Sequence, residues 1–225
     1  MTTNRVKERS IKYILLSIAI ISTSIVFFIF AFLIKESLPA FQEIGLNLFS
    51  FKWHVQNGSF GLAPAILGTL LVTFVALIIV IPIGISSALF LSEIASPKTR
   101  NILKPLIELL SGIPSIVYGF IGIVIFVPYI GDKFNLLSGY TILTGGVVLG
   151  IMALPIVISI SDDAIQSVPD EMKNASLALG ATKWETMKNV TLPAAISGVS
   201  TSIILGAEDG VSGLDDVGVE IGRPI

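Results

Sequence analysis

Apolar residues fill long uninterrupted stretches of this chain, and charged residues gather in the segments between those stretches. A helix needs about 20 predominantly apolar residues to cross the hydrocarbon layer of a membrane. Four stretches reach this length, at 13–34, 62–91, 105–130 and 139–161. The pattern therefore predicts an all-α fold, a polytopic transmembrane helical bundle of about five helices with the last one incomplete.

The incomplete helix is the apolar stretch 192–206, which spans only about 22 Å at 1.5 Å per helical residue. Glu208 and Asp209 follow it, and carboxylates near the centre of a bilayer are costly. We therefore expect the fifth helix to end near Gly206, before an acidic and atypical tail at 207–225.

Basic residues predict the orientation of these spans. Ten of them lie in segments 1–12, 92–104 and 162–191, against three in the connections on the opposite side, Lys35, Lys52 and Lys133. Because cytoplasmic loops carry the excess of Lys and Arg, the N-terminal tail 1–12 and the 162–191 loop should be cytoplasmic, with segment 35–61 external. The remaining apolar stretches and the loops between them then lie within 62–206.

Composition agrees with a chain that lives in a lipid bilayer, since 53% of its residues are hydrophobic and 13% are charged. It has no cysteine and a single histidine, which excludes a disulfide framework, a thiolate metal site and a histidine cluster. We expect no metal, no cofactor and no nucleic-acid partner. His54 is interpreted as an ordinary polar surface residue.

The polar loop 162–191 contains the signals of a helical hairpin. Pro169 and the acidic pair after it mark a helix start, and Gly180 marks its stop, which predicts a helix over 169–179. Thr182 then caps a second helix, and Glu185 completes a capping box. Two short helices should therefore be joined at Gly180–Ala181.

Each helix of this hairpin should carry an apolar stripe, and Pro193 should limit the second helix. The stripes are Met172, Ala175 and Leu179 on the first helix, and Trp184 and Met187 on the second. They could lie on the bilayer surface or under the spans of the chain itself. Alternatively, they form a docking element for a cytosolic partner.

The sequence "SGIPSIVYG" predicts a break in the third span, at Gly112 and Pro114. Broken helices are tolerated in membranes where protein or a watery cavity satisfies the freed backbone groups. The hydroxyls of Ser111, Ser115 and Tyr118 could therefore line a translocation pathway. A packing kink between helices is the alternative.

Glu108 is the one charge placed inside a predicted span, and it could pair with Lys104 one helical turn away. An ion-coupled secondary transporter is an alternative function, but it would normally need several such intramembrane charges.

The stretch "EMKNASLALGATKWETMKNVTLPAA" resembles the cytoplasmic EAA-type loop of ABC importer permeases, with matching residues at Glu171, Ala175, Gly180 and Leu192–Pro193. The stretch "IELLSGIPSIVYGFIG" is similar to phosphate-specific transport permeases. Two further stretches, "FGLAPAILGTLLVTFVALIIVIPIGISSALFLSEIA" and "ISISDDAIQSVP", favour their C-type subunit, PstC. The resemblance implies a MetI-like permease fold, with the permease domain at 62–206.

The resemblance also implies partners: a second permease subunit of the A type, cytosolic ATPase subunits and an external phosphate-binding protein. It assigns ATPase coupling to the hairpin residues Glu171, Ala175, Leu179, Gly180, Ala181, Trp184 and Pro193. The chain has no Gly-x-x-x-x-Gly-Lys-Ser/Thr motif, so ATP hydrolysis is expected on a partner and no catalytic residue is expected here.

The sequence departs from the family's pattern after Gly206. The family continues with an Arg-Ala-x-Gly-Glu-Thr-like stretch and a further span, whereas this chain reads "AEDGVSGLDDVGVEIGRPI". A third interpretation is therefore a truncated permease fragment without transport activity. On this basis the chain as written is expected not to support phosphate uptake.

Overall fold

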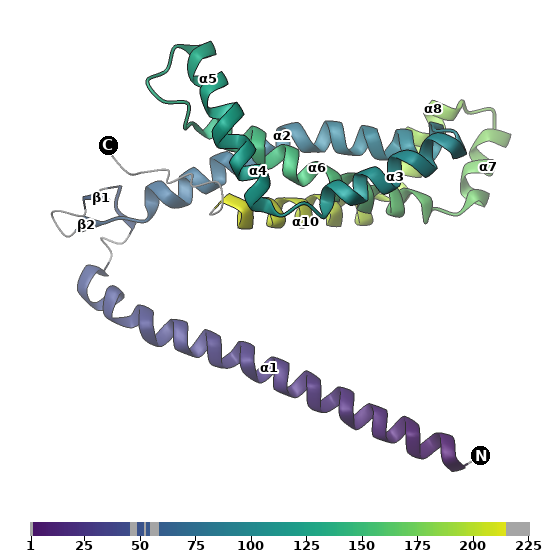
Figure 1. Ribbon diagram of the computed structural model, residues 1–225. Coiled ribbons are helices and arrows are strands. Elements are labelled where there is room, and N and C mark those ends of the chain that lie inside the picture. The colour runs from purple at the N-terminus through teal and green to yellow at the C-terminus, as the bar shows by residue number, and fades with distance from the viewer. Residues whose placement is uncertain (1, 46–48, 52, 55–58, 215–225) are drawn as a thin grey trace. The chain divides into compact units, whose positions relative to one another are not determined.

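The computed structural model describes residues 2–45, 49–51, 53–54 and 59–214, and helices account for most of them (Figure 1). The chain divides into two units, Met1–Pro64 and Ala65–Ile225. In the first unit, α1 covers Thr2–Ile44, and the two-residue strand β1 (Trp53–His54) pairs antiparallel with β2 (Ser59–Phe60). Helix α1 is longer than the expected span 13–34, because hydropathy limits how much of a helix lies in lipid and not how far the helix continues.

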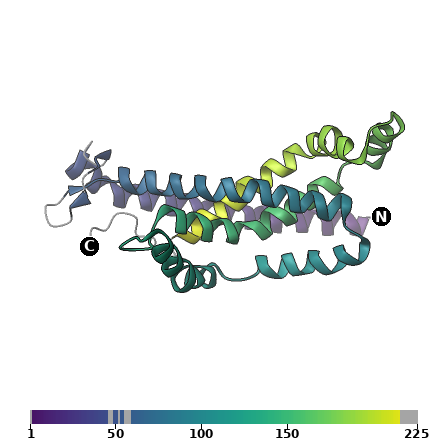
Figure 2. The same ribbon diagram turned by 90° about the horizontal axis from the view of Figure 1, so that it is seen from above.

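The chain continues from α2 as a succession of α-helices and π-helical turns, the latter labelled η. They are α2 (Ala63–Leu89), η3 (Phe90–Ile94), α3 (Pro97–Ser111), α4 (Ser115–Ile121), η4 (Gly122–Phe126), α5 (Val127–Phe134), α6 (Ile142–Gln166), α7 (Asp170–Ala178), α8 (Lys183–Thr186), η5 (Met187–Thr191), α9 (Leu192–Ala194) and α10 (Ile196–Leu214). Figures 1 and 2 show α2, α6 and α10 alongside one another. Helices α7 and α8 lie at one end of this bundle, called the hairpin end below.

Helix α6 lies at the centre of the bundle and contributes more buried residues to the core than any other described helix. Val72 of α2 packs with Leu149 of α6, and Val80 of α2 packs with Val157. Ile165 of α6 joins a further cluster near the hairpin end that includes residues of α2 and α10. These fully buried apolar side chains hold the helices together by close packing.

The prediction of an all-α bundle with four long spans and an incomplete fifth is confirmed. Among the described residues, four helices are long and apolar enough to cross a membrane: Ile11–Pro39, Ala63–Ile94, Ser115–Phe134 and Ile142–Gln166. A fifth span arises if the helical stretches Lys183–Ala194 and Ile196–Asp209, bent by 70° relative to each other, count as one.

The third span starts later than predicted. It begins at Ser115 and not at residue 105, because Pro114 lacks a backbone N–H and disfavours helical geometry at the residue before it. Helix α3 is therefore a separate helix, and Glu108 lies in it, outside the candidate span.

The helical stretch that starts at Lys183 ends at Ala194, one residue after Pro193 and before a bend of 70°, as expected for a helix limited by this proline. Pro193 itself occupies the first turn of α9, where its missing N–H is tolerated. The expected end of the last helix near Gly206 is wrong, because α10 continues through Glu208 and Asp209 to Leu214. Carboxylates oppose burial in hydrocarbon but do not prevent helical backbone hydrogen bonds. The length of the apolar stretch therefore underestimates the length of this helix. Residues 215–225 of the acidic tail lie outside the described residues.

Candidate functional site

The hairpin end carries the predicted pair of short helices. Helix α7 ends in the expected glycine cap, where Gly180 adopts a φ of +92°. The N–H of Ala181 donates to the carbonyl of Ser176 at 3.2 Å, and that of Gly180 to the carbonyl of Leu177 at 3.0 Å. These two bonds form a Schellman motif, which satisfies carbonyls at the helix end and fixes the direction of the chain after it.

The capping box that starts the second helix is confirmed. The N–H of Thr182 donates to Glu185 Oε2 at 2.8 Å, and the N–H of Glu185 donates to Thr182 Oγ1 at 3.2 Å. These bonds, first the backbone N–H of Thr182 and then its hydroxyl, lower the pKa of Glu185 below its ordinary value. The turn between the two helices is therefore fixed on both sides.

The tip of the hairpin presents large apolar side chains away from the bundle. Leu179 is 90% exposed and Trp184 is 65% exposed, and Met172 is exposed as well. The other predicted coupling residues are also at the surface, with Ala181 half-buried and the rest exposed: Glu171, Ala175, Gly180 and Pro193. The described part of the chain does not cover this surface.

Met187 does not belong to that surface, so the stripe predicted for the second helix is wrong. It is 8% exposed and lies on the buried side with Thr186 and Thr191. The π-helical turn η5 follows α8 directly and places these residues toward the protein interior. Trp184 is therefore the only member of the predicted stripe that faces outward.

Two polar contacts hold the hairpin in place. Ser176 of α7 and Thr186 of α8 share a hydrogen bond of 3.0 Å between their hydroxyls, which joins the two helices. Lys173 of α7 donates to Glu93 Oε1 of η3 at 2.7 Å, which joins the hairpin to the end of α2. No local pattern in the sequence predicts either contact.

A buried carboxylate near the hairpin end joins α3 to α6. Asp162 is fully buried, and its Oδ2 accepts from Arg100 at 2.8 Å, from Lys104 at 3.2 Å and from the Gln166 amide at 2.7 Å. Asp163, which is exposed, also accepts from Lys104. Two cations and an amide compensate for the burial of one carboxylate.

The predicted Lys104–Glu108 pair is replaced by this cluster. Two carboxylates on α6 face Lys104, whereas a lysine that precedes a glutamate by four residues forms the weaker orientation of a helical pair. Burial alone would lower the pKa of Lys104, but the hydrogen bonds and charges of Asp163 and Asp162 outweigh burial and raise it. The signal in the sequence is the acidic pair directly after an apolar run, a position that by itself predicts a loop.

The break between α3 and α4 is confirmed at Gly112–Pro114, and the protein itself satisfies several of the freed carbonyls. Ser111 Oγ donates to the carbonyl of Glu108 at 2.8 Å, and the Tyr118 hydroxyl donates across the break to the carbonyl of Leu110 at 2.9 Å. The N–H of Gly112 donates to the carbonyl of Leu109 at 3.2 Å. The break is thus a fixed, hydrogen-bonded corner.

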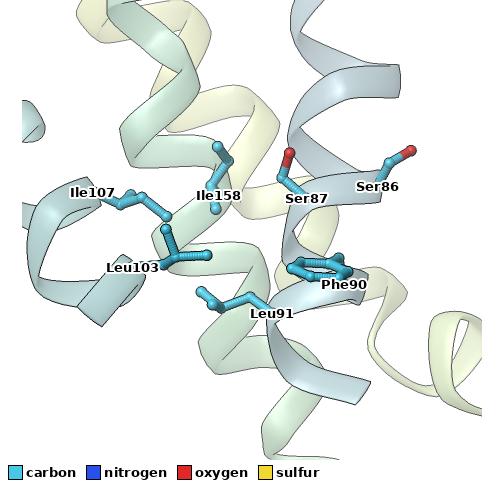
Figure 3. Close-up of a pocket in the computed structure, with 7 residues that line it drawn as sticks. All are labelled: Ser86, Ser87, Phe90, Leu91, Leu103, Ile107 and Ile158. Atoms are coloured by element: carbon cyan, nitrogen blue, oxygen red, sulfur yellow. The ribbon is translucent and has the colours of Figure 1, made fainter. Parts of the chain in front are cut away.

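A pocket of about 350 Å³ separates part of α3 from α2. Figure 3 shows its lining, with Leu103 and Ile107 from α3 and the remaining residues from α2, η3 and α6: Ser86, Ser87, Phe90, Leu91 and Ile158. No residue of α3 is buried. The apolar face of α3 is therefore loosely packed, and its polar contacts with α6 gain importance.

A bundle of membrane-length helices with a hydrogen-bonded, exposed hairpin at one end defines a polytopic membrane protein. Comparison with known sequences specifies its family. The family described as "Binding-protein-dependent transport system inner membrane component" matches residues 80–214. This chain belongs to that family and is a multi-pass inner-membrane permease component.

Individual relatives agree with this assignment. The chain is 40% identical over 181 residues to the probable ABC transporter permease protein YqgH of Bacillus subtilis, covering 78% of this chain and 59% of the relative. It is 36% identical over 218 residues to the phosphate transport system permease protein PstC of Pasteurella multocida, covering 86% and 64%. The chain thus spans less than two thirds of these relatives' lengths.

Solved structures support the same fold. A chain of the MetNI methionine ABC transporter, in an inward-facing conformation, superposes with a TM-score of 0.56 at 22% identity, covering 66% of this chain and 68% of that chain. The MetI-like fold expected for this chain is therefore confirmed.

Proposed function

We propose that this chain is a permease subunit of an ATP-driven phosphate importer and forms part of the translocation pathway. Its partners would be a second permease subunit of the A type, cytosolic ATPase subunits and an external phosphate-binding protein. Phosphate is proposed because relatives named as phosphate transport permeases match most of this chain at 30–36% identity. ATP hydrolysis belongs to the partner ATPase.

The observation that carries the proposal is the exposed tip of the hairpin. Leu179 and Trp184 lie on either side of a turn that a Schellman motif and a capping box hold in one conformation. A transport subunit that binds no ATP can respond to an ATPase only through a contact whose free energy differs between the states of that ATPase. A rigid apolar tip suits such a contact. The coupling residues are Glu171, Ala175, Leu179, Gly180, Ala181, Trp184 and Pro193.

For the pathway, we propose that the broken helix forms part of its wall, through Ser111, Gly112, Pro114, Ser115 and Tyr118. The hydroxyls of Ser111 and Tyr118 already donate to backbone carbonyls, so their role is to shape the corner and not to donate to phosphate. Cysteines introduced at Ser115 and Tyr118 should react with small hydrophilic reagents in at least one nucleotide state. No reaction in any state would favour simple helix packing.

The hairpin end is proposed to face the cytosol, on the ten-to-three distribution of basic residues. The chain has no cysteine, so a single cysteine at Asn174 or at Gln56 reports on one site alone. Impermeant reagents applied to intact cells should label Gln56→Cys and spare Asn174→Cys. The reverse result would invert the orientation.

The central experiment is copurification of the ATPase from membranes that express this chain with its partner subunits. Leu179→Asp should reduce ATPase recovery about tenfold or more, as loss of a central interface anchor does. Leu137→Asp is the matched control, because Leu137 is also a fully exposed leucine but lies outside the hairpin. Equal recovery with both variants would contradict the coupling role. Phosphate uptake that persists without ATP would indicate a secondary transporter.

A further inference from the structure

The contact between Lys173 and Glu93 links two segments that are 80 residues apart in the sequence. Lys173 Nζ lies 2.7 Å from Glu93 Oε1, and the two side chains are only 16% and 18% exposed. Asp170 is also near Lys173, at 4.0 Å, but its side chain is 88% exposed. Glu93 is therefore the main partner of Lys173, and their contact is shielded from much of the screening that weakens surface pairs.

Glu93 lies at the position where a displacement of the hairpin can be transmitted to the helices of the bundle. It belongs to η3, the π-helical turn that ends α2, and Ala95 and Ser96 lead from η3 directly into α3. The N–H of Ala95 still donates to the carbonyl of Phe90 at 2.8 Å, so the connection is hydrogen-bonded up to its last residue. A displacement of η3 is therefore transmitted to the start of α3.

Helix α3 is joined to α6 by polar contacts at Asp162. Arg100 and Lys104 attach the first half of α3 to α6, while the pocket beside Leu103 and Ile107 leaves its apolar face loosely packed (Figure 3). With no buried residue of its own, α3 depends for its position on this ionic contact with α6 and on its chain connection to η3.

These contacts close a ring. Helix α6 continues into α7, α7 is joined to η3 by Lys173 and Glu93, η3 continues into α3, and α3 is joined to α6 by the Asp162 cluster. In a closed ring, no member can move without displacing its neighbours or breaking a joint. The far end of α3 is the corner at Gly112–Pro114.

We propose that Glu93 and Lys173 are a positioning pair that makes the coupling hairpin and α3 move as one body. Displacement of α7 then reaches the broken helix through α3 as well as through α6. The inference rests on the proposed function in one respect, that a partner displaces the hairpin. The joint itself can be tested without that partner.

The first experiment measures amide hydrogen exchange of the purified chain in lipid nanodiscs. Lys173→Met should increase exchange in α7 and η3 about two- to fivefold, the range expected for loss of a partly exposed ion pair. Lys173→Arg and the charge swap Glu93→Lys with Lys173→Glu should restore protection. Lys98→Met, which removes an exposed charge from α3, is the control and should change nothing in either segment.

The second experiment first asks whether the reconstituted complex transports phosphate at all, which the sequence after Gly206 argues against, and then measures phosphate transported per ATP hydrolysed. Lys173→Met should keep normal ATPase recovery, because the hairpin tip is intact, but should transport less phosphate per ATP, and the charge swap should restore the ratio. A pair with a purely structural role would lower the amount of complex without changing that ratio.

An unchanged exchange pattern, or an unchanged transport ratio at normal complex yield, would overturn the inference. So would a charge swap that behaves like the single variants. If the wild-type chain recruited no ATPase, the proposed function would be wrong, and the exchange experiment would still decide whether the pair joins α7 to η3.

Discussion

The contacts of α6 with α10 and with α3 hold neighbouring helices by opposite means. Between α6 and α10 the contact is close and mostly apolar, with Val199 and Ile165 fully buried in one cluster and the Ser161 and Ser202 hydroxyls paired at 2.7 Å. Between α6 and α3 the contact depends on Arg100, Lys104 and the buried Asp162.

The difference indicates which contacts are able to rearrange. Dispersion contacts in a close-packed interface are numerous and tolerate little change in volume, so α6 and α10 should behave as one rigid element. A few strong, directional charge contacts can break and form again as discrete states. The comparison therefore places the fixed part of the bundle at α6–α10 and its adjustable part at α3 and the hairpin.

Among the variants that test this difference between the two contacts, removal of the charge of Asp162 should have the largest effect on the free energy of unfolding. Asp162→Asn leaves Arg100 without its carboxylate partner and should lower the free energy of unfolding by about 3–5 kcal/mol, the cost of breaking a buried ion pair from one side. Thermal or denaturant unfolding in detergent micelles, followed by circular dichroism, would measure it.

Asp163→Asn is the matched control for that prediction. Asp163 follows Asp162 directly, but its side chain is 63% exposed, so loss of its contact with Lys104 should cost about 1 kcal/mol or less. Equal destabilisation by the two variants would show that the burial of Asp162 is not what matters at the α3–α6 joint.

A larger side chain within the α6–α10 contact should have the next largest effect on the free energy of unfolding. A Cβ on Gly198 of α10 would overlap the Cβ of Ala164 on α6, and neither atom can rotate away, so the helices would have to separate. Gly198→Val should destabilise the chain by about 1–3 kcal/mol in the same unfolding measurement. Ser200→Val, on an exposed position of α10, should cost much less.

Gly198→Val and Asp162→Asn together also test the division of the bundle into a fixed part and an adjustable part. Gly198→Val should change hydrogen exchange along α6 and α10 and leave α3 less affected, whereas Asp162→Asn should increase exchange mainly in α3. A uniform increase in both variants would mean that the bundle unfolds as one cooperative unit.

Local signals explain why the hairpin and the broken helix could be predicted from the sequence. The glycine cap at Gly180, the Thr182–Glu185 box and the stop before Pro114 each depend on residues within a few positions of one another. Four of the membrane-length helices follow from apolar length, although their ends do not, since Pro114 shifts one boundary and α10 continues through Glu208.

Long-range partners explain what the sequence could not predict. Helical spacing pairs Lys104 with its sequence neighbour Glu108, yet the partners of Lys104 lie almost 60 residues away on α6. Lys173 and Glu93 are 80 residues apart and carry no local signal. Which of several surface charges meet depends on how the helices pack, and helical periodicity within one segment does not contain that information.

The turn of the hairpin should be more sensitive to backbone conformation than to volume, unlike the α6–α10 contact. A Cβ on Gly180 would have open space around it, but the φ of +92° strains any residue with a side chain. Gly180→Val should therefore destabilise the hairpin by about 1–2 kcal/mol and reduce ATPase recovery. Gly180→Asn should be milder, because asparagine tolerates left-handed geometry better than β-branched residues. Normal ATPase recovery with Gly180→Val at normal abundance would contradict the coupling role of the turn.

The smallest expected effect is the pH dependence of the capping box, which shows how an exposed charge contact differs from the buried one at Asp162. Hydrogen bonds from the Thr182 N–H and hydroxyl lower the pKa of Glu185 in the folded hairpin below 4.5. A lowered folded pKa means that this stabilisation is fully present above the ordinary pKa and is lost as the pH falls through the folded value. Hydrogen exchange in α8, corrected for intrinsic rates, should therefore be constant from pH 7 down to the ordinary pKa range of glutamate and should increase only below that range.

Glu185→Gln is the control for this prediction. Its amide oxygen still accepts the capping bonds but does not titrate, so the acid-induced increase should disappear. An increase of the same size in this variant would assign the acid sensitivity of the hairpin to other carboxylates.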